Sequence, residues 1–190
     1  MPSLACVPEI ADLVRSSQPR CGATRLLCVD GPAGSGKTTL AAGLAIALGN
    51  APVVHMDDLF EGWGQDLGAP LAARVEAGLL RAWVSGRPGT HPRYDWELGR
   101  FAERVEVPAA AVVILEGCAS ASAGIRDRAS LVVWVEAPPA VRLARGLRRD
   151  GTPLEAQWRA WQDHEAAHFA ADGTRAAADV IVDGDGRIVR

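Results

Sequence analysis

The chain has 190 residues, of which 48% are apolar and 23% are charged, and its formal net charge is −3. This length and composition suit a single globular domain that can bury a substantial core. The slightly negative charge gives no electrostatic case for a nucleic-acid partner. No apolar stretch approaches the roughly 18 residues of a membrane helix, and the first residues lack the pattern of a signal peptide. We therefore expect a cytoplasmic protein without a membrane partner.

The first predicted element, at residues 8–17, is a short amphipathic helix, and a phosphate-binding loop follows at residues 31–38. The loop reads Gly-Pro-Ala-Gly-Ser-Gly-Lys-Thr and fits the G-x-x-x-x-G-K-[ST] pattern. Its glycines allow backbone N–H groups to converge on phosphate oxygens. Lys37 would reach the β- and γ-phosphates, and the Thr38 hydroxyl would ligate Mg²⁺. The nucleotide contacts that we expect are Gly31, Ala33, Gly34, Ser35, Gly36, Lys37, Thr38 and Thr39.

The flanking sequence supports this interpretation. Residues 25–30 predict a buried strand, and residues 39–48 predict a helix that ends at Gly49. A strand, a glycine loop and a helix are the required order, because the helix N-terminus adds partial positive charge. Lys37 is also the only lysine in the chain, at the one position where a point-like ammonium is needed.

A second predicted strand, residues 52–56, ends in two carboxylates, Asp57 and Asp58. Carboxylates at the C-terminal end of a parallel strand lie beside the ligand crevice of an open α/β sheet. We interpret the pair as a base or a Mg²⁺-associated acid. The alternative is a helix N-cap, which aspartate commonly supplies.

The middle of the chain predicts a loop with Trp63 at residues 60–68, a helix at 70–84 and a second loop at 87–99. The second loop holds His91, Arg93, Tyr94, Asp95 and Trp96. This set would form either a wall of the substrate site or ordinary packing. Residues 104–108 alternate like an edge strand.

The last third of the chain continues the alternation of strands and helices. Residues 111–115 predict a central strand that ends at Glu116, and residues 131–136 and 179–183 predict two more strands. An arginine-bearing helix opens at residues 138–139, and a capping box at 152–155 starts another helix that runs to about 171. The pattern predicts an α/β fold in which a five-stranded parallel sheet has helices on both faces, as one domain over residues 1–190.

Two other segments of the chain partly match metal-binding patterns. Residues 164–168 spell H-E-x-x-H, the zinc-protease signature. A zinc protease needs a third ligand farther on, and no Glu or His follows His168. Residues 183–186 hint at a calcium loop, but the later Glu is missing and a tight turn explains them better.

These segments together resemble the uridine kinase family of P-loop small-molecule kinases, over about residues 26–184. The phosphate loop alone is unspecific, so the likeness rests on the ordered segments that follow it. Residues 56–60 look like the family's D-x-F-Y segment and residues 93–96 like its P-x-Y-D-F segment. Further matches are residues 114–117 (E-G), 141–150 (R-L-x-R-R-x-x-R-D) and 178–182 (A-D-x-x-I). The resemblance implies a P-loop kinase fold with a short arginine-bearing lid at about residues 145–153.

The resemblance also implies chemistry: the transfer of the γ-phosphoryl group of ATP, with Mg²⁺, to a hydroxyl of a small molecule. Asp57 would take the proton of the acceptor hydroxyl, and Glu116 with Thr38 would hold Mg²⁺ through water. Two arginines would clamp the transferring phosphoryl group, which gives the catalytic set Lys37, Asp57, Arg145 and Arg149. The expected acceptor contacts are Asp58, Phe60, Trp63, Arg93, Tyr94 and Trp96.

The chain departs from the family where the acceptor would bind. The family has a His five residues after this Tyr, and here position 99 is Gly; one lid arginine is replaced by Gly146. A nucleoside is the first expectation, although uridine and cytidine should be poor acceptors. The alternatives are a sugar acid, a vitamin precursor or a nucleotide, or a nucleotide-binding switch. A GTPase switch would need an N-K-x-D segment, which the chain lacks. A homo-oligomer is compatible with the sequence.

Overall fold

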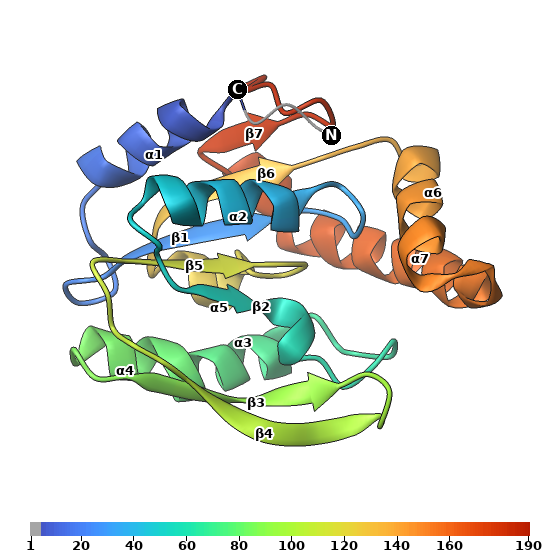
Figure 1. Ribbon diagram of the computed structural model, residues 1–190, viewed down its shortest axis with the longest axis horizontal. Coiled ribbons are helices and arrows are strands. Elements are labelled where there is room, and N and C mark those ends of the chain that lie inside the picture. Colours follow the sequence, from blue (N-terminus) through green and yellow to red (C-terminus); the bar gives the residue numbers. More distant parts are fainter. Residues whose placement is uncertain (1–4) are drawn as a thin grey trace.

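A computed structural model describes residues 5–190 and contains the expected central sheet. Five strands form one parallel sheet in the order β2-β5-β1-β6-β7 (Figure 1). The strands are β1 (Arg25–Asp30), β2 (Val53–His55), β5 (Val112–Glu116), β6 (Ala129–Val135) and β7 (Val180–Val182). The predicted α/β fold with a five-stranded parallel sheet is therefore confirmed.

Helices cover both faces of the sheet, as predicted. On one face lie α1 (Val7–Ser16) and α2 (Lys37–Ala47). The opposite face is covered by helices that follow β2 and by later helices of the chain. These are α3 (Ala69–Val75), the π-helical η2 (Glu76–Leu80), α4 (Arg81–Val84), α5 (Ala123–Arg126), α7 (Glu155–Asp172) and α8 (Thr174–Ala177).

The alternation of side chains along each strand divides the core into two clusters. In β1, Leu27 and Val29 join the cluster beneath α1 and α2. Leu26 and Cys28 point the other way and join the cluster beneath α3 and α7. Because both faces are buried, the strands read as continuous apolar runs, which is why the sequence identified all five.

A β-hairpin beside the main sheet corrects two predictions. The loop expected at residues 87–99 is wrong, because β3 (Gly89–Asp95) pairs there with β4 (Arg100–Val107) in an antiparallel ribbon. β4 contains the strand expected at residues 104–108, but it belongs to this ribbon and not to the edge of the main sheet. Pro92 has no N–H to donate, and the register shifts between Pro92 and Tyr94. A proline inside a strand pattern favours a loop prediction, which explains the error.

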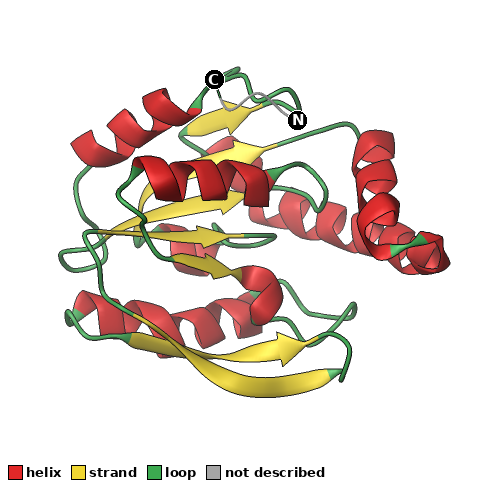
Figure 2. Ribbon diagram, viewed as in Figure 1, coloured by secondary structure: helices red, strands yellow, loops and turns green. Residues whose placement is uncertain are grey.

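Two helices form an arm at one end of the molecule: α6 (Pro139–Asp150) and α7, joined by the short η3 (Thr152–Leu154). Figure 2 shows α6 standing apart from the sheet, with α7 running back beneath it. The predicted capping box is wrong, because no side chain among the described residues caps η3 or α7. Glu155 instead accepts a hydrogen bond of 2.6 Å from Arg159, one turn later on α7.

Gly146 has a packing reason for lacking a side chain. A Cβ at this position of α6 would lie 2.4 Å from ring atoms of Trp158 on α7. The indole of Trp158 is 1% exposed, so it has no room to move away. The arginine that the resemblance leads one to expect at position 146 is therefore incompatible with this arm.

Cys28 and Cys118, in and beside the central strands, are buried and free. The tight turn at residues 183–186 is confirmed, since the Asp183 carboxylate accepts N–H bonds of 2.9 Å from Asp185 and Arg187. Within residues 5–190, none of the helices combines the length and the apolar character needed to span a bilayer.

Candidate nucleotide and acceptor site

The phosphate loop connects β1 to α2 and is pressed between β6 and α6. Gly31 has φ 137°, and a Cβ there would lie 2.1 Å from the carbonyl oxygen of Val135. Gly34 has φ 77°, and its Cβ would lie 2.6 Å from the carbonyl oxygen of Arg142. Both positions need glycine because of the positive φ and of the close backbone contact.

The N-terminus of α2 can bind an anion. Gly36 is its N-cap at φ 113°, and no side chain among residues 5–190 caps this end. Thr38 and Thr39 lie exposed in the first turn. The unsatisfied N–H groups of an 11-residue helix therefore face a site that suits a phosphate.

Lys37 lies under the loop, where it remains an ammonium. Its side chain is 6% exposed, and Nζ donates a hydrogen bond of 3.0 Å to the carbonyl oxygen of Pro32. Burial lowers the pKa of Lys37, but the charges of Cys118 and Glu116 oppose this, and the net effect raises the pKa. A fixed positive charge beside the helix N-terminus fits the role predicted for Lys37.

Asp30, which the sequence analysis did not single out, fixes the start of the loop. The carboxylate is fully buried and accepts N–H bonds from Gly31 (2.6 Å), Ala119 (3.0 Å) and Ala121 (2.8 Å). Burial raises the pKa of Asp30 to about 7, although these N–H donors lower it. Asp30 could have been identified from its position in the sequence, at the end of a predicted strand and directly before the first glycine of the loop.

Glu116 ends β5 next to the loop, and its carboxylate lies beside a hydroxyl. Thr38 Oγ1 is 3.3 Å from Glu116 Oε1 and 3.4 Å from Oε2. On its other side Glu116 binds Nδ1 of His55, and this hydrogen bond is the main cause that raises the pKa of His55. A hydroxyl and a carboxylate side by side are oxygen donors of the kind that Mg²⁺ prefers, so these residues fit the predicted magnesium site.

Asp57 follows β2, in the short η1 (Met56–Asp58), and opens into the same region. Its side chain is exposed, yet protein atoms surround it closely enough that desolvation raises its pKa. Lys37 is the strongest charge that acts in the opposite direction, and Arg149 adds to it. The main-chain oxygen of Asp57 accepts a bond of 3.2 Å from Trp96 Nε1, which ties η1 to the hairpin.

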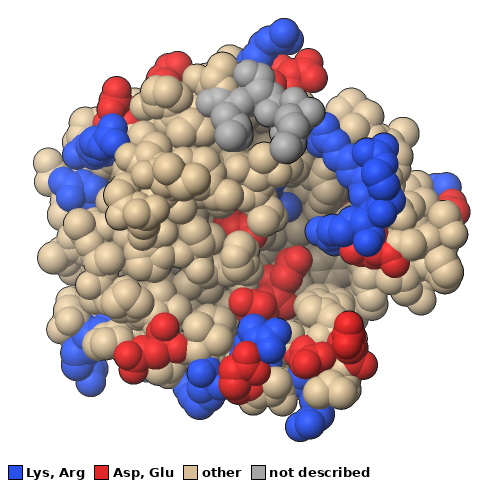
Figure 3. Space-filling view, in the orientation of Figure 1, with Lys and Arg blue, Asp and Glu red and all other residues tan. Residues whose placement is uncertain are grey.

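The two predicted lid arginines occupy different places. Arg145 donates to the carbonyl oxygens of Gly34 (3.3 Å) and Ser35 (3.2 Å), so it holds the back of the loop. Arg149 is exposed, pairs with Asp150 at 2.7 Å and lies over the ring of Trp158. Figure 3 shows acidic side chains on the floor of a hollow and a band of basic ones beside it, over α6.

Aromatic side chains from three parts of the chain meet around Trp63. Its ring lies 5.8 Å from Trp96 on the hairpin side, 5.9 Å from Trp158 and 6.1 Å from Trp161. Tyr94 continues the row at 5.4 Å from Trp96. Three of the predicted acceptor contacts, Trp63, Tyr94 and Trp96, are therefore brought together.

Two other predicted acceptor contacts are engaged elsewhere. Phe60 is 1% exposed, and its ring packs 5.5 Å from that of Trp161; its contact with an acceptor stays a prediction. Arg93 pairs across the hairpin with Glu103 at 2.6 Å. Asp58 is half-buried beside Asp57, and its charge acts on Arg93.

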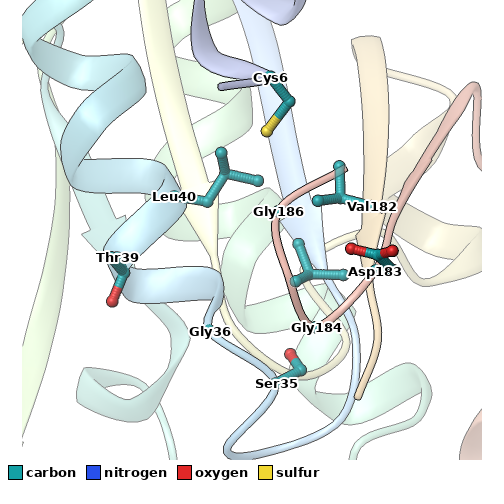
Figure 4. A pocket seen from close by; sticks show the side chains of 10 residues that line it. Cys6, Ser35, Gly36, Thr39, Leu40, Val182, Asp183, Gly184 and Gly186 are labelled. Atoms are coloured by element: carbon teal, nitrogen blue, oxygen red, sulfur yellow. The ribbon is translucent and has the colours of Figure 1, made fainter. Parts of the chain in front are cut away.

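A small cavity continues from the loop toward the C-terminal end of the sheet (Figure 4). It lies between the start of α2 and the turn after β7, with Thr39 on one side and Asp183 on the other. Ser35 Oγ is buried and has no hydrogen-bond partner among the described residues. Figure 4 shows this hydroxyl directed into the cavity.

Comparisons with known proteins agree with the fold. A cytidylate kinase of Aeropyrum pernix is 33% identical over 126 residues, which are 66% of this chain and 65% of that protein. A cytidylate kinase of Natronomonas pharaonis is 31% identical over 130 residues, 68% of this chain and 61% of that protein. The chain thus spans less than two thirds of the length of these curated relatives. No protein-family model matches the chain.

Among solved structures, a possible uridine kinase of Bacillus stearothermophilus superposes with a TM-score of 0.66. The match covers 92% of this chain and 96% of that one at 20% sequence identity. An identity this low supports the fold and not the activity. Together with the loop, the sheet order and the helix that follows the loop, the likeness shows that the chain has the fold of P-loop kinases.

Proposed function

We propose that the protein is an ATP-dependent kinase that phosphorylates a hydroxyl group of a small, unphosphorylated molecule. The observation that carries this proposal is a group of charged side chains at the N-terminus of α2, where Thr38 lies 3.3 Å from Glu116 and the charges of Lys37 and Asp57 act on each other. Phosphoryl transfer depends mainly on positioning and on charge stabilisation, which these groups supply.

The charge of the acceptor side favours an unphosphorylated substrate. Residues 55–68 and 89–107 hold eight acidic side chains against three arginines. Arg93 is paired with Glu103, and Arg104 donates to the Thr90 hydroxyl at 2.7 Å. A phosphate acceptor would need free cations to bind it, and a surplus of carboxylates would repel it. The cytidylate named for the two relatives is such an acceptor, so we do not carry that substrate over.

The reaction follows from these positions. Asp57 takes the proton of the acceptor hydroxyl, whose oxygen forms a bond to the γ-phosphorus as the bond to the β,γ-bridging oxygen breaks, and ADP leaves. Lys37 and Arg149 stabilise the negative charge that spreads over the transferring group. Thr38 and Glu116 would hold Mg²⁺, which supplies further charge neutralisation on the phosphates.

The aromatic surface around Trp63 would receive the rest of the acceptor. Trp96 is 42% exposed, and Trp63 and Tyr94 are half-buried, so apolar or flat parts of a substrate can pack there. A nucleoside fits such a surface. Gly99 offers no side chain that could read a pyrimidine, so we expect uridine and cytidine to be poor acceptors.

The test is a coupled assay of ADP release across a panel of acceptors. The panel contains purine and pyrimidine nucleosides, sugar acids, other small alcohols and cytidylate. We expect turnover with an unphosphorylated alcohol, and a kcat/KM for cytidylate, uridine and cytidine below ~10⁴ M⁻¹s⁻¹. Efficient phosphorylation of cytidylate would contradict the proposed acceptor class and return the chain to the activity named for its relatives.

A further inference from the structure

Glu165 on α7 is a buried acid that the proposed chemistry does not use. It belongs to the H-E-x-x-H pattern at residues 164–168, and its side chain is 1% exposed. Oε2 accepts an N–H bond of 2.7 Å from Ala33 in the phosphate loop, and Oε1 accepts a bond of 2.6 Å from Arg142. The acid of an apparent zinc motif therefore contacts the loop itself.

Arg142 on α6 completes the contact from the other side. Its guanidinium is buried and donates 3.1 Å bonds to the carbonyl oxygens of Ala33 and Ala137. Ala33 is thus held at both ends, with its N–H on Glu165 and its C=O on Arg142. Arg145 holds the next two carbonyl oxygens of the loop, those of Gly34 and Ser35.

This arrangement turns successive carbonyl oxygens of the loop toward α6. An anion site needs the opposite ends of the peptide groups, the N–H donors, to converge without competing oxygens. Arg142 and Arg145 hold carbonyl oxygens outside the site. Glu165 fixes the same peptide segment by accepting the N–H of Ala33, which is then not among the donors that face the phosphates. These contacts prepare the loop before a nucleotide binds, which reduces the ordering cost of binding.

A general role in stability explains the pair less well. Burying two charges costs desolvation energy that an ion pair only partly offsets, and apolar replacements are often as stable or more stable. The pair also joins α6, α7 and the loop, because each of its members bonds the other and Ala33.

We propose that Glu165 and Arg142 are positioning residues of the phosphate site, which hold Ala33 so that the loop is preformed for ATP. The inference rests on the proposed nucleotide binding. Loss of the pair should weaken ATP affinity and raise the KM for ATP, and the KM for the acceptor should stay unchanged. This pattern distinguishes the pair from residues that contact the reacting groups.

The decisive variant is the double substitution R142M/E165L. It replaces the ion pair with apolar side chains of similar length, which preserves a purely structural role and removes both contacts to Ala33. Glu165→Gln is the second variant. It keeps the shape of the side chain and one acceptor oxygen, but its NH₂ group must face one of the two donors, the N–H of Ala33 or Arg142. Glu155→Gln, which breaks an exposed pair with Arg159 on the same helix, is the matched control.

The measurements are the Kd of a non-hydrolysable ATP analogue with Mg²⁺ by calorimetry, the two KM values and a thermal melt. We expect both variants of the pair to bind the analogue about 10- to 100-fold more weakly, as a displaced binding group would, while the control is unchanged. A folded double variant that binds within about two-fold of wild type overturns the inference. If the double variant does not fold, Glu165→Gln decides by the same criterion. A wild-type protein that fails to bind the analogue would instead reject the proposed function.

Discussion

Asp57 is the residue whose protonation should control the reaction. Desolvation by the surrounding protein atoms raises the pKa of this carboxyl above the usual 3.8, because the opposing effects of Lys37 and Arg149 are weaker. The carboxylate form, which accepts the proton, is therefore present above the raised pKa and is lost as the pH falls through it.

We expect kcat to decrease toward low pH, and the midpoint of this decrease should lie above the pKa of an ordinary aspartate. Asp57→Asn should lower kcat by about 10²- to 10⁴-fold with little change in ATP affinity, the usual range for a positioned proton acceptor. The measurement is the pH profile of kcat for wild type and variant. Asp58→Asn is the control and should have the smaller effect on kcat. A larger effect of Asp58→Asn would identify Asp58 as the base.

Arg145 and Arg149 are expected to differ, although the sequence treats them alike. Arg149→Ala should lower kcat more than it weakens ATP binding, because its charge acts on the cleft where negative charge spreads in the transition state. Arg145→Ala should mainly weaken ATP binding, because Arg145 holds the carbonyl oxygens of Gly34 and Ser35. Steady-state kinetics and calorimetry on both variants test this; equal losses of kcat at unchanged ATP affinity would favour two phosphate clamps.

The residues that the sequence predicts well are those whose chemistry is local. The loop glycines and Lys37 are fixed by a short pattern and by the strand and helix beside it. Glu165 and Arg142 could not be assigned, because their partner Ala33 lies more than 100 positions away in the chain. The burial of Phe60 could not be predicted for a related reason, since it depends on packing against Trp161 of α7.

At the scale of elements, the arm formed by α6 and α7 depends on Gly146. An added Cβ would lie 2.4 Å from the Trp158 ring, and Trp158 also donates a bond of 3.0 Å to Asp150 and lies under Arg149. The glycine therefore allows the close packing that places Arg149 at the end of α6.

Gly146→Ala should destabilise the protein by about 1–3 kcal/mol, since overpacking outweighs the roughly 1 kcal/mol that alanine gains in helix propensity. The change should appear as a lower Tm and as a reduced kcat, because Arg149 moves with the helix. Gly64→Ala is the control, because a Cβ there would meet nothing within 4 Å. A Tm at or above that of wild type would show that the Trp158 ring can shift to make room for the added Cβ.

Elements also mark the limit of prediction from sequence. The five buried strands were identified because apolar runs have one explanation in an alternating α/β pattern. The hairpin was missed because Pro92 interrupts β3, and its pairing with β4 is decided by contacts outside the main sheet. The capping box failed because Thr152 begins the η3 turn before α7, which moves the start of that helix to Glu155.

For the whole molecule, binding of ATP with Mg²⁺ should stabilise the native state. At a concentration 100-fold above the Kd, the gain is about 2.7 kcal/mol, or roughly 5–10 °C in Tm for a domain of this size. Lys37→Ala should abolish phosphoryl transfer and most of this shift, while its own Tm without ligand stays near that of wild type. Thermal melts with and without nucleotide test both statements; a full shift in the variant would contradict the assignment of the loop.

The aromatic cluster around Trp63 has an optical consequence. The chain has six tryptophans, and four of them, Trp63, Trp96, Trp158 and Trp161, meet where the acceptor loop, the hairpin and α7 adjoin. The other two, Trp83 and Trp134, lie in the core. Four of the six indoles that can emit are therefore gathered in one cluster. Docking of an acceptor on this surface should change the solvent around Trp96 and Trp63, the two indoles of the cluster that are exposed or half-buried. The emission of the protein should therefore report an occupied acceptor site without an added dye.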